Sequence, residues 1–289
     1  GLGNVDLSSG FNLSGTTHTN AGTYANDSWS FHDPSGNYAD ASGTVNNDIS
    51  KASATIVVTP YSVTYDGQAH TASVTTISGV NGESGNTVGT VDVSHTTHSG
   101  ASTYSTDYWS FAGSVNYSDI SATTITDTIN KANAAIVVTP YSLTYDGQSH
   151  TAAVTISGVN GETGATVGTV DLSHTAHVGA GTYNSDSWTF TGTANYNDIG
   201  ATTITDTIAK ATASVVVTPY ALTYDGDPHS AVATSITGVN GETGGTVGSV
   251  DVSNTTHTNA GTYSADTWAF TGTANYNDIP ATIITDVIN

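Results

Sequence analysis

The sequence has no cysteine, no methionine and no arginine, and only three lysines carry a fixed positive charge among its 289 residues. Without cysteine there is no disulfide framework and no thiolate nucleophile. Asp and Glu number 24, which gives a formal net charge of −21. So few cations cannot neutralise nucleic-acid phosphates or hold the chain on an anionic membrane surface. We therefore expect no nucleic-acid partner.

Long apolar runs and the motifs of catalysis are also missing. No stretch of 18 apolar residues occurs, so direct membrane insertion is not expected. The chain has no Gly-x-Ser-x-Gly, no phosphate-cradling glycine loop and no recurring Ser-His-Asp set, and we predict that it is not an enzyme. It has no initiator methionine and no signal peptide, and we interpret it as a mature segment of something longer or the visible part of an assembly.

An internal repeat is the main feature that is present. Trp29, Trp109, Trp188 and Trp268 lie 80, 79 and 80 residues apart. A fixed period of this length indicates a tandem array of small domains. We predict four segments, namely a partial repeat that matches the second half of a unit and three full repeats: residues 1–51, 52–131, 132–210 and 211–289.

Each full repeat is expected to be all-β. Short alternating segments are separated by turn dipeptides such as Asp146-Gly147 and Asn160-Gly161, and no window has helical periodicity with caps. This pattern predicts tandem immunoglobulin-like β-sandwich domains in an elongated rod. In the repeat 132–210 the expected strands are residues 135–139, 143–145, 150–156, 166–174, 182–191 and 201–208.

The period differs by one residue between repeats, and the difference falls in the third expected strand. His70 to Gly79 and His229 to Gly238 span nine steps, whereas His150 to Gly158 spans eight. One extra residue would reverse the faces of a strand unless a β-bulge absorbs it. We predict a bulge in the third strand of the two longer copies.

One recurring stretch is interpreted as the joint between repeats. It runs from Ile125 to Gly147 and returns at Ile204, and nothing in it resembles a flexible linker. We expect residues 204–218 to form one nearly continuous extended segment, which would make a stiff rod; an ordinary short link is the alternative. The residues assigned to the joint are Lys51, Lys131, Lys210, Pro60, Pro140 and Pro219.

The recurring lysine has two interpretations. Asp206, Ile208 and Lys210 share parity on the last expected strand. A Lys–Asn isopeptide cross-link, of the kind found in some bacterial surface sandwiches, needs a lysine beside a carboxylate. An exposed lysine that pairs weakly with the acidic surface is the alternative.

Aromatic residues recur at fixed places in the repeat and are expected to build its core. The Ala-Gly-Thr-Tyr segment ending at Tyr183 resembles a tyrosine corner, in which the hydroxyl bonds back to the backbone. The core residues assigned in this way are Trp29, Trp109, Trp188, Trp268, Tyr24, Tyr104, Tyr183 and Tyr263. A second set, expected to be exposed in loops and able to contact glycans, is Tyr117, Tyr196 and Tyr276.

Metal and modification sites receive little support. His95 and His98 lie three apart, so on a strand they would point to opposite faces, and we predict no metal site. The chain lacks the Asp-x-Asp-x-Asp-Gly loop of a dedicated calcium cage, and we predict no cofactor. Weak calcium binding at Asp127 and Asp206, which we place at junctions, and covalent glycans on Ser, Thr or Asn stay open as alternatives.

Several segments together resemble a known family. The run from Thr139 to Ala152, which includes Tyr145-Asp-Gly, is followed by Gly158-Val-Asn-Gly-Glu, Ala180-Gly-Thr-Tyr and Asn195-Tyr-Asn-Asp. As a set they are similar to the MBG-type, Tyr-Asp-Gly-containing repeats of very large bacterial surface proteins. The resemblance covers nearly the whole chain and implies tandem β-sandwich arrays at the cell surface or outside the cell, in adhesins or stalks, with no catalytic residues.

Two functions are consistent with these features. The first is a structural subunit or stalk segment of an extracellular bacterial filament or surface fibre. The partial repeat 1–51 would leave strand edges and apolar surface open, and we expect preceding chain or a neighbouring subunit to complete it, giving self-assembly head to tail. The alternative is an adhesin region whose repeats bind glycans or a host or biofilm surface.

Overall fold

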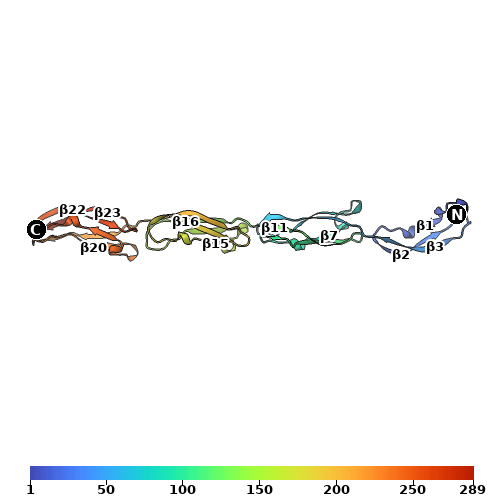
Figure 1. Ribbon diagram of the computed structural model, residues 1–289, viewed down its shortest axis with the longest axis horizontal. Coiled ribbons are helices and arrows are strands. Elements are labelled where there is room, and N and C mark those ends of the chain that lie inside the picture. Colours follow the sequence, from blue (N-terminus) through green and yellow to red (C-terminus); the bar gives the residue numbers. More distant parts are fainter. The chain divides into compact units, whose positions relative to one another are not determined.

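The computed structural model describes residues 1–289, and the chain is all-β with short 3-10 helices (Figure 1). It divides into two compact units, Gly1–Ala132 and Asn133–Asn289, which are described one at a time. None of its helices is long and apolar enough to cross a membrane.

The second unit begins with a repeat of two sheets. One sheet is the antiparallel pair β12–β14, and the other has the order β13-β17-β16-β15. Within the larger sheet, β13 runs parallel to β17, and the other neighbours are antiparallel. The strands are β12 (Ala135–Thr139), β13 (Ser142–Thr144), β14 (Ala153–Ser157), β15 (Gly168–Asp171), β16 (Gly181–Gly192) and β17 (Ile199–Ala209).

The same arrangement follows in the rest of this unit. The pair β18–β20 forms one sheet and the order β19-β23-β22-β21 forms the other, again with a parallel pair between β19 and β23. The strands are β18 (Ser214–Thr218), β19 (Ala221–Leu222), β20 (Val232–Thr237), β21 (Gly248–Asp251), β22 (Gly261–Gly272) and β23 (Ile279–Ile288).

The first unit holds a three-stranded sheet, β1-β2-β3, and then one complete set of strands. In that set β4 pairs with β6, β5 runs parallel to β11, and the order β10-β9-β7 forms a further sheet. The strands are β1 (Phe11–Asn12), β2 (Gly22–Phe31), β3 (Ala41–Ile49), β4 (Thr55–Thr59), β5 (Ser62–Thr64), β6 (Ser73–Ser78), β7 (Gly89–Asp92), β8 (Ser102–Tyr104), β9 (Tyr108–Gly113), β10 (Ile120–Thr124) and β11 (Asp127–Asn130).

Single turns of 3-10 helix connect the strands, and the sequence patterns did not predict them. They are η1 (Leu2–Asn4), η2 (Ser8–Gly10), η3 (Ser14–Thr16), η4 (Val80–Gly82), η5 (Gly85–Thr87), η6 (Ser94–Thr96), η7 (Val159–Gly161), η8 (Gly164–Thr166), η9 (Ser173–Thr175), η10 (Val239–Gly241), η11 (Gly244–Thr246) and η12 (Ser253–Thr255). Asn160 at the centre of η7 has φ 53°, in the left-handed region that Asn tolerates better than most residues.

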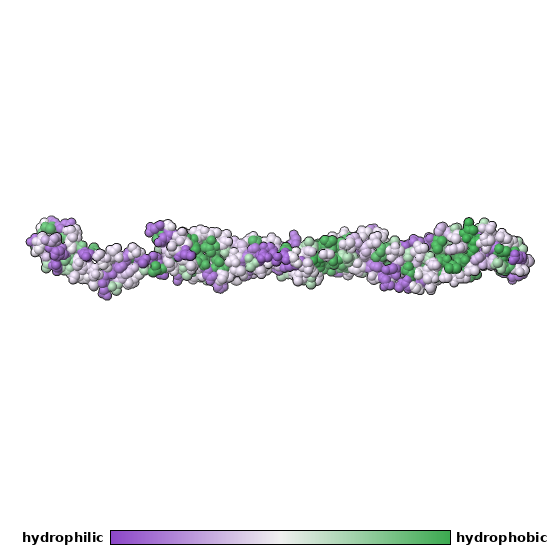
Figure 2. Space-filling view, turned by 180° about the vertical axis from the view of Figure 1, so that it is seen from behind, coloured by the Kyte–Doolittle hydropathy of each residue, from purple (hydrophilic) through white to green (hydrophobic).

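The core lies between the sheets of each complete repeat. In the first unit Val88, Phe111 and Tyr117 are buried, and apolar residues of β4 and β6 pack against them. The predicted core tryptophans Trp109 and Trp188 are each 8% exposed, whereas Trp29 and Trp268 are only partly buried. Apolar residues also reach the surface, where Figure 2 shows several green patches. The outward valines of β4, β12 and β18 are Val57, Val137 and Val216.

The predicted bulge is confirmed in both longer copies. The pairing of β4 with β6 slips so that Val57 faces Thr76 and Val58 faces Val74, which leaves Thr75 as the extra residue. The same slip leaves out Thr234 in β20, and the β12–β14 pair has no irregularity. The bulge therefore absorbs the extra residue and keeps the inward face of the strand unchanged.

The tyrosine corner also has the predicted hydrogen bond. Tyr183 Oη donates to the Gly179 carbonyl over 2.7 Å, and Tyr104 Oη donates to the Gly100 carbonyl over 2.7 Å. Tyr24 and Tyr263 make the same bond to the carbonyl four residues earlier, over 2.7 and 2.6 Å. These hydroxyls fix the start of the long strands β2, β16 and β22 and of the short strand β8.

The predicted continuous segment 204–218 is wrong. β17 ends at Ala209 and β18 begins at Ser214, and the two strands belong to different sheets. Between them Ala211 forms a parallel bridge to Tyr276, with its amide donating to the Asn275 carbonyl over 2.9 Å. The link is thus short and hydrogen-bonded, but it is not one strand.

Candidate functional site

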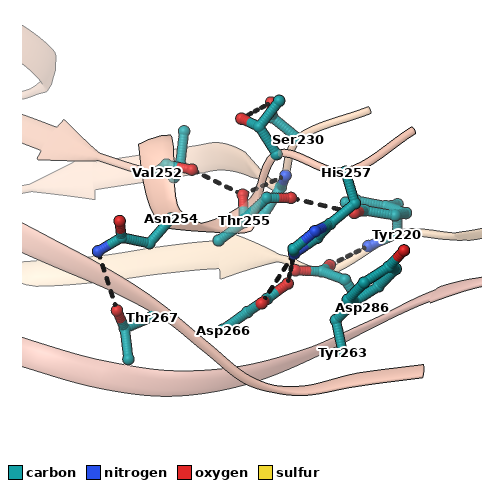
Figure 3. A network of polar contacts seen from close by, with 12 residues as sticks. Tyr220, Ser230, Val252, Asn254, Thr255, His257, Tyr263, Asp266, Thr267 and Asp286 are labelled. Carbon is teal, nitrogen blue, oxygen red and sulfur yellow. Dashed lines mark hydrogen bonds and ion pairs between the residues drawn. The ribbon is translucent and has the colours of Figure 1, made fainter. Parts of the chain in front are cut away.

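The most distinctive polar network in the chain lies inside the repeat, and Figure 3 shows it for the last copy. His257 Nε2 lies 2.9 Å from each carboxylate oxygen of Asp266. Asp286, on the neighbouring strand β23, accepts the backbone amide of Tyr220 over 2.9 Å. The His257 ring stacks on Tyr263 with a centroid distance of 3.5 Å. Segments far apart in the sequence therefore meet at one pair of aspartates.

The same network recurs in all three complete repeats. In the last two copies the carboxylates pair across antiparallel strands, and in the first copy Asp107 lies between β8 and β9. In each copy the histidine approaches from the segment that follows a 3-10 turn. Asp206 and Asp127 are 0% exposed, and their partners Asp186 and Asp107 are each 5% exposed. The three sets are His98–Asp107–Asp127, His177–Asp186–Asp206 and His257–Asp266–Asp286.

In each pair, the pKa of the buried aspartate is raised above its ordinary value. Burial raises the pKa of Asp206 above its ordinary value, and the hydrogen-bonded, negatively charged Asp186 adds to that rise. The backbone amide of Tyr141 opposes it by donating to Asp206 Oδ1 over 2.8 Å. Asp206 Oδ2 receives no hydrogen bond and has no contact with solvent. The pair therefore favours a proton on one of its two carboxyl groups more strongly than a free aspartate does.

In the N-terminal sheet, an asparagine takes the place of the second aspartate of this network. His18 Nε2 lies 2.7 Å from Asp27 Oδ2, but Asn47 stands where the complete repeats have the second aspartate. Asn47 Nδ2 donates to Asp27 Oδ2 over 2.7 Å, and this bond is the main reason why the pKa of Asp27 is lowered. The side-chain amide of Asn has the shape of a protonated carboxyl group and no charge. It donates the same hydrogen bond without having to take up a proton.

A partly buried tyrosine closes the network on the side of the first strands. Tyr141 Oη donates to the Thr175 carbonyl over 3.1 Å, and burial together with Asp206 raises the pKa of Tyr141 to about 12. Thr175 Oγ1 in turn accepts the Ala152 amide over 3.1 Å. The network thus connects the first, middle and last strands of the repeat. No group of three or more His, Asp or Glu side chains in the chain could hold a metal ion.

A second cluster joins the two repeats of the second unit. Glu242 accepts hydrogen bonds from Tyr276 of its own repeat and from Tyr145 of the preceding one, the latter over 2.5 Å. The two rings meet edge to face with a centroid distance of 5.7 Å. Ala180 N also donates across the joint to Asn275 Oδ1 over 2.9 Å. We call Tyr145, Glu242 and Tyr276 the joint triad.

The first unit has the same joint without the first tyrosine. Ala21 N donates to Asn116 Oδ1 over 2.7 Å, as Ala180 does to Asn275. Tyr117 donates to Glu83, and Val80 N donates to Tyr117 Oη over 2.9 Å. Residues 1–51 contain no Tyr-Asp-Gly loop, so no second tyrosine from this segment reaches Glu83.

The prediction that Tyr117, Tyr196 and Tyr276 are exposed is wrong. They are 1%, 0% and 0% exposed, because the loop that carries each of them, Asn-Tyr-Ser at Tyr117 and Asn-Tyr-Asn at the other two, folds inward and places the hydroxyl on a glutamate. These rings therefore have no free face on which a sugar could stack. In sequence the loop appears polar, and the glutamate that accepts the hydroxyl lies 34 residues earlier.

Of the residues assigned to the joint, the lysines lie in the links between repeats, whereas the prolines lie elsewhere. Lys51, Lys131 and Lys210 are exposed, and the Nζ atoms of Lys51 and Lys210 lie 3.4 Å from the Ser114 and Thr273 carbonyls. Since β17 ends before Lys210, this lysine does not share the buried face of Asp206. The exposed residues Pro60, Pro140 and Pro219 lie inside the repeats, where the chain crosses from one sheet to the other.

The candidate calcium ligands Asp127 and Asp206 lie inside their repeats rather than at junctions, and each faces another aspartate. The paired histidines separate as expected from their spacing: His98 contacts Asp107, whereas His95 is exposed and stacks on Tyr108.

Comparison with models of known protein families and with curated proteins gives no match for this chain.

Proposed function

We propose that the chain is a structural segment of an extracellular bacterial filament or surface fibre, built from tandem immunoglobulin-like sandwiches that carry tension along their length. The similarity to MBG-type surface repeats supports the location outside the cell. The acidic surface, with a formal net charge of −21, supports solubility and mutual repulsion between neighbouring fibres.

The parallel pair between the second and last strands of each repeat carries this proposal. In the repeat 132–210, Leu143 of β13 pairs with Ile208 of β17. The same pairing joins β5 to β11 and β19 to β23. A force on the two ends of a repeat pulls such strands in opposite directions along their axes. All hydrogen bonds of the pair are then loaded together in shear, rather than broken one at a time.

The joint in the second unit supports the same function. The joint triad, the Ala180–Asn275 bond and the Ala211 bridge connect consecutive repeats without a free spacer. Tension therefore passes from the last strand of one repeat into the first strand of the next through ordered chain. The alternative of glycan adhesion loses its main support, because the tyrosines on which it relied are buried.

Pulling the full chain by its ends tests the proposal. We expect three unfolding events of similar force, one for each complete repeat of about 80 residues. Each event should release a repeat whose extended chain spans about 260–290 Å, at ~3.3–3.6 Å per residue, and lengthen the molecule by that span less the length of the folded repeat. Extension at low force without distinct events would contradict a role in bearing tension. Antibodies against the chain should also label thin surface fibres on intact source cells.

A further inference from the structure

The loop that follows β19 contains a peptide bond that the matching loops of the other repeats lack. After Tyr-Asp-Gly, the repeats 52–131 and 132–210 continue with Gln68-Ala69 and Gln148-Ser149, whereas the last repeat continues with Asp227-Pro228. An Asp-Pro bond is more reactive than other peptide bonds. The aspartate carboxylate lies beside its own carbonyl carbon, and the proline nitrogen, which belongs to a tertiary amide, is a better leaving group than an ordinary amide nitrogen.

Hydrogen bonds close this loop around the Asp-Pro bond. Asp225 Oδ1 accepts the Asp227 amide over 3.0 Å and lies 2.9 Å from His229 Nε2. The backbone of His229 is fixed in turn, because it exchanges hydrogen bonds of 2.9 and 3.0 Å with His257. The same aspartate and histidine positions close the loop in the other two complete repeats. The bond is therefore held between two anchored residues.

The carboxylate of Asp227 is free to act as a nucleophile. Its side chain is exposed and makes no hydrogen bond. The chain has one other Asp-Pro bond, at Asp33, and there the carboxylate is not free. Asp33 is 5% exposed, and its oxygens accept the backbone amides of Ser35, Asn37 and Tyr38. Of the two Asp-Pro bonds, only the one at Asp227 thus has a carboxylate available for attack.

His229 is placed to give a proton to the leaving nitrogen. It is the residue after Pro228, its Nε2 is held by Asp225, and its Nδ1, the ring nitrogen nearer the backbone, makes no hydrogen bond. The other groups that face it are Tyr220, whose ring centroid is 5.9 Å away, and the backbone of His257. Histidine is the side chain that typically gains a proton at mildly acidic pH, so a donor is available there.

We propose that the chain cleaves itself at the Asp227–Pro228 bond under mildly acidic conditions. A carboxylate oxygen of Asp227 bonds to the carbonyl carbon of the same residue, and the bond from that carbon to the Pro228 nitrogen breaks. The nitrogen takes a proton from His229, and Asp227 is left as a cyclic anhydride. Water then opens the anhydride to two carboxyl groups, so that one water molecule is consumed for each peptide bond. Each chain reacts once.

The cleavage separates β19 from β20 within the last repeat. β18 and β19 stay with residues 1–227, and β20 to β23 stay with residues 228–289. The two fragments remain joined by the pairing of β18 with β20 and of β19 with β23. A closed length of chain thus becomes a non-covalent contact that a pull on the two ends can separate. The cleavage itself does not rest on the proposed function.

Incubating the full chain at about pH 5.5 and at about pH 7.5 tests the proposal, with the products read by mass spectrometry. We expect fragments 1–227 and 228–289, formed faster at the lower pH, and no cleavage at Asp33-Pro34. Added hydroxylamine should react with the anhydride and appear as a hydroxamate on Asp227. A synthetic peptide of residues 222–232 gives the rate without the fold. The folded chain should react about tenfold faster or more, since a positioned proton donor contributes at least that much.

Variants that remove one role at a time complete the test. Asp227→Asn removes the nucleophile and Pro228→Ala removes the leaving group, and each should stop the cleavage. His229→Gln should slow it and abolish its increase at acidic pH. Gln148→Asp combined with Ser149→Pro places the same pair in the matching loop of the preceding repeat, which is closed in the same way, and should create a second cleavage site there.

Three results would overturn the proposal. The first is a folded chain that stays intact at the acidic pH. The second is a rate that is the same in the folded chain and in the peptide, or that His229→Gln leaves unchanged, because the fold would then contribute nothing. The third is cleavage that persists in Asp227→Asn, which would point to a contaminating protease. None of them bears on the pulling experiment, which uses intact chain at neutral pH.

Discussion

Replacing Asp206 with Asn is expected to stabilise the second unit at pH 7. Burial raises the pKa of Asp206 above its ordinary value, so the folded chain favours the protonated carboxyl group more than the unfolded chain does. This lowers the stability at neutral pH by about 1.4 kcal/mol for each unit by which the folded pKa exceeds the unfolded one. An amide removes this effect, as Asn47 does beside Asp27.

The sign of the pH dependence follows from the same pair. A raised pKa means that the contribution of Asp206 to stability is complete below about pH 4 and is lost as the pH rises through the folded pKa. Aspartates such as Asp146 and Asp171, whose pKa values are lowered by hydrogen bonds, act in the opposite sense and lose their contribution below about pH 4. The wild-type chain should therefore be most stable at mildly acidic pH.

Thermal unfolding between pH 4 and pH 7 measures this effect. Asp206→Asn should raise the midpoint temperature of unfolding at pH 7. The expected rise is about 2–4 °C for each kcal/mol of added stability in a unit of this size, and the midpoint should depend less on pH. Asp227→Asn is the matched control, because Asp227 is exposed and its carboxylate has no hydrogen bond. A lower midpoint for Asp206→Asn at pH 7, with the pH dependence unchanged, would contradict a raised pKa for Asp206.

Replacing Glu242 with Ala is expected to produce the largest loss of stability at the joint. Two hydroxyls that are buried or nearly so, on Tyr145 and Tyr276, lose their common acceptor. Leaving a buried donor unsatisfied costs about 1–3 kcal/mol, so the expected loss is roughly 2–6 kcal/mol. The pKa of Glu242 is lowered mainly by Tyr145, and its contribution is therefore present at neutral pH and lost only below about pH 4.5.

Glu83→Ala provides the comparison for this variant. Glu83 occupies the same place in the first unit but accepts a hydrogen bond only from Tyr117. We therefore expect Glu83→Ala to lose about half as much stability as Glu242→Ala. Hydrogen exchange in the loop Tyr145–Gly147 should increase in Glu242→Ala and stay unchanged in Glu83→Ala. Equal losses for the two variants would mean that Tyr145 contributes nothing to the joint.

Features that depend on local spacing could be predicted from the sequence. The first strand was predicted at its exact bounds, because alternating apolar residues and the following Thr-Pro step define Ala135–Thr139. The bulges followed from one extra residue in a strand whose inner face is buried. The tyrosine corner followed from the Ala-Gly-Thr-Tyr segment, because its hydrogen bond spans only four residues.

Features that depend on distant partners were missed or misplaced. The Asn-Tyr-Asn loops appeared exposed, although their tyrosines reach glutamates 34 residues away. The prolines were wrongly assigned to the joint because they recur, and the contact of Tyr145 with Glu242 was missed because it spans 97 residues. Asp206 was noted for its parity with Ile208, but its partner Asp186 lies on the neighbouring strand. In the sequence, the one sign of the Asp186–Asp206 pair is that position 47 has Asn where the complete repeats have Asp.

Comparing two pulling directions on one repeat tests the claim of tension-bearing repeats most directly. The chain has no cysteine, so handles can be attached to introduced cysteine pairs alone. Thr139→Cys with Lys210→Cys loads β13 and β17 in shear, and Asp146→Cys with Lys210→Cys peels them apart from one end. We expect a several-fold higher unfolding force for the first pair. Equal forces in the two directions would contradict it.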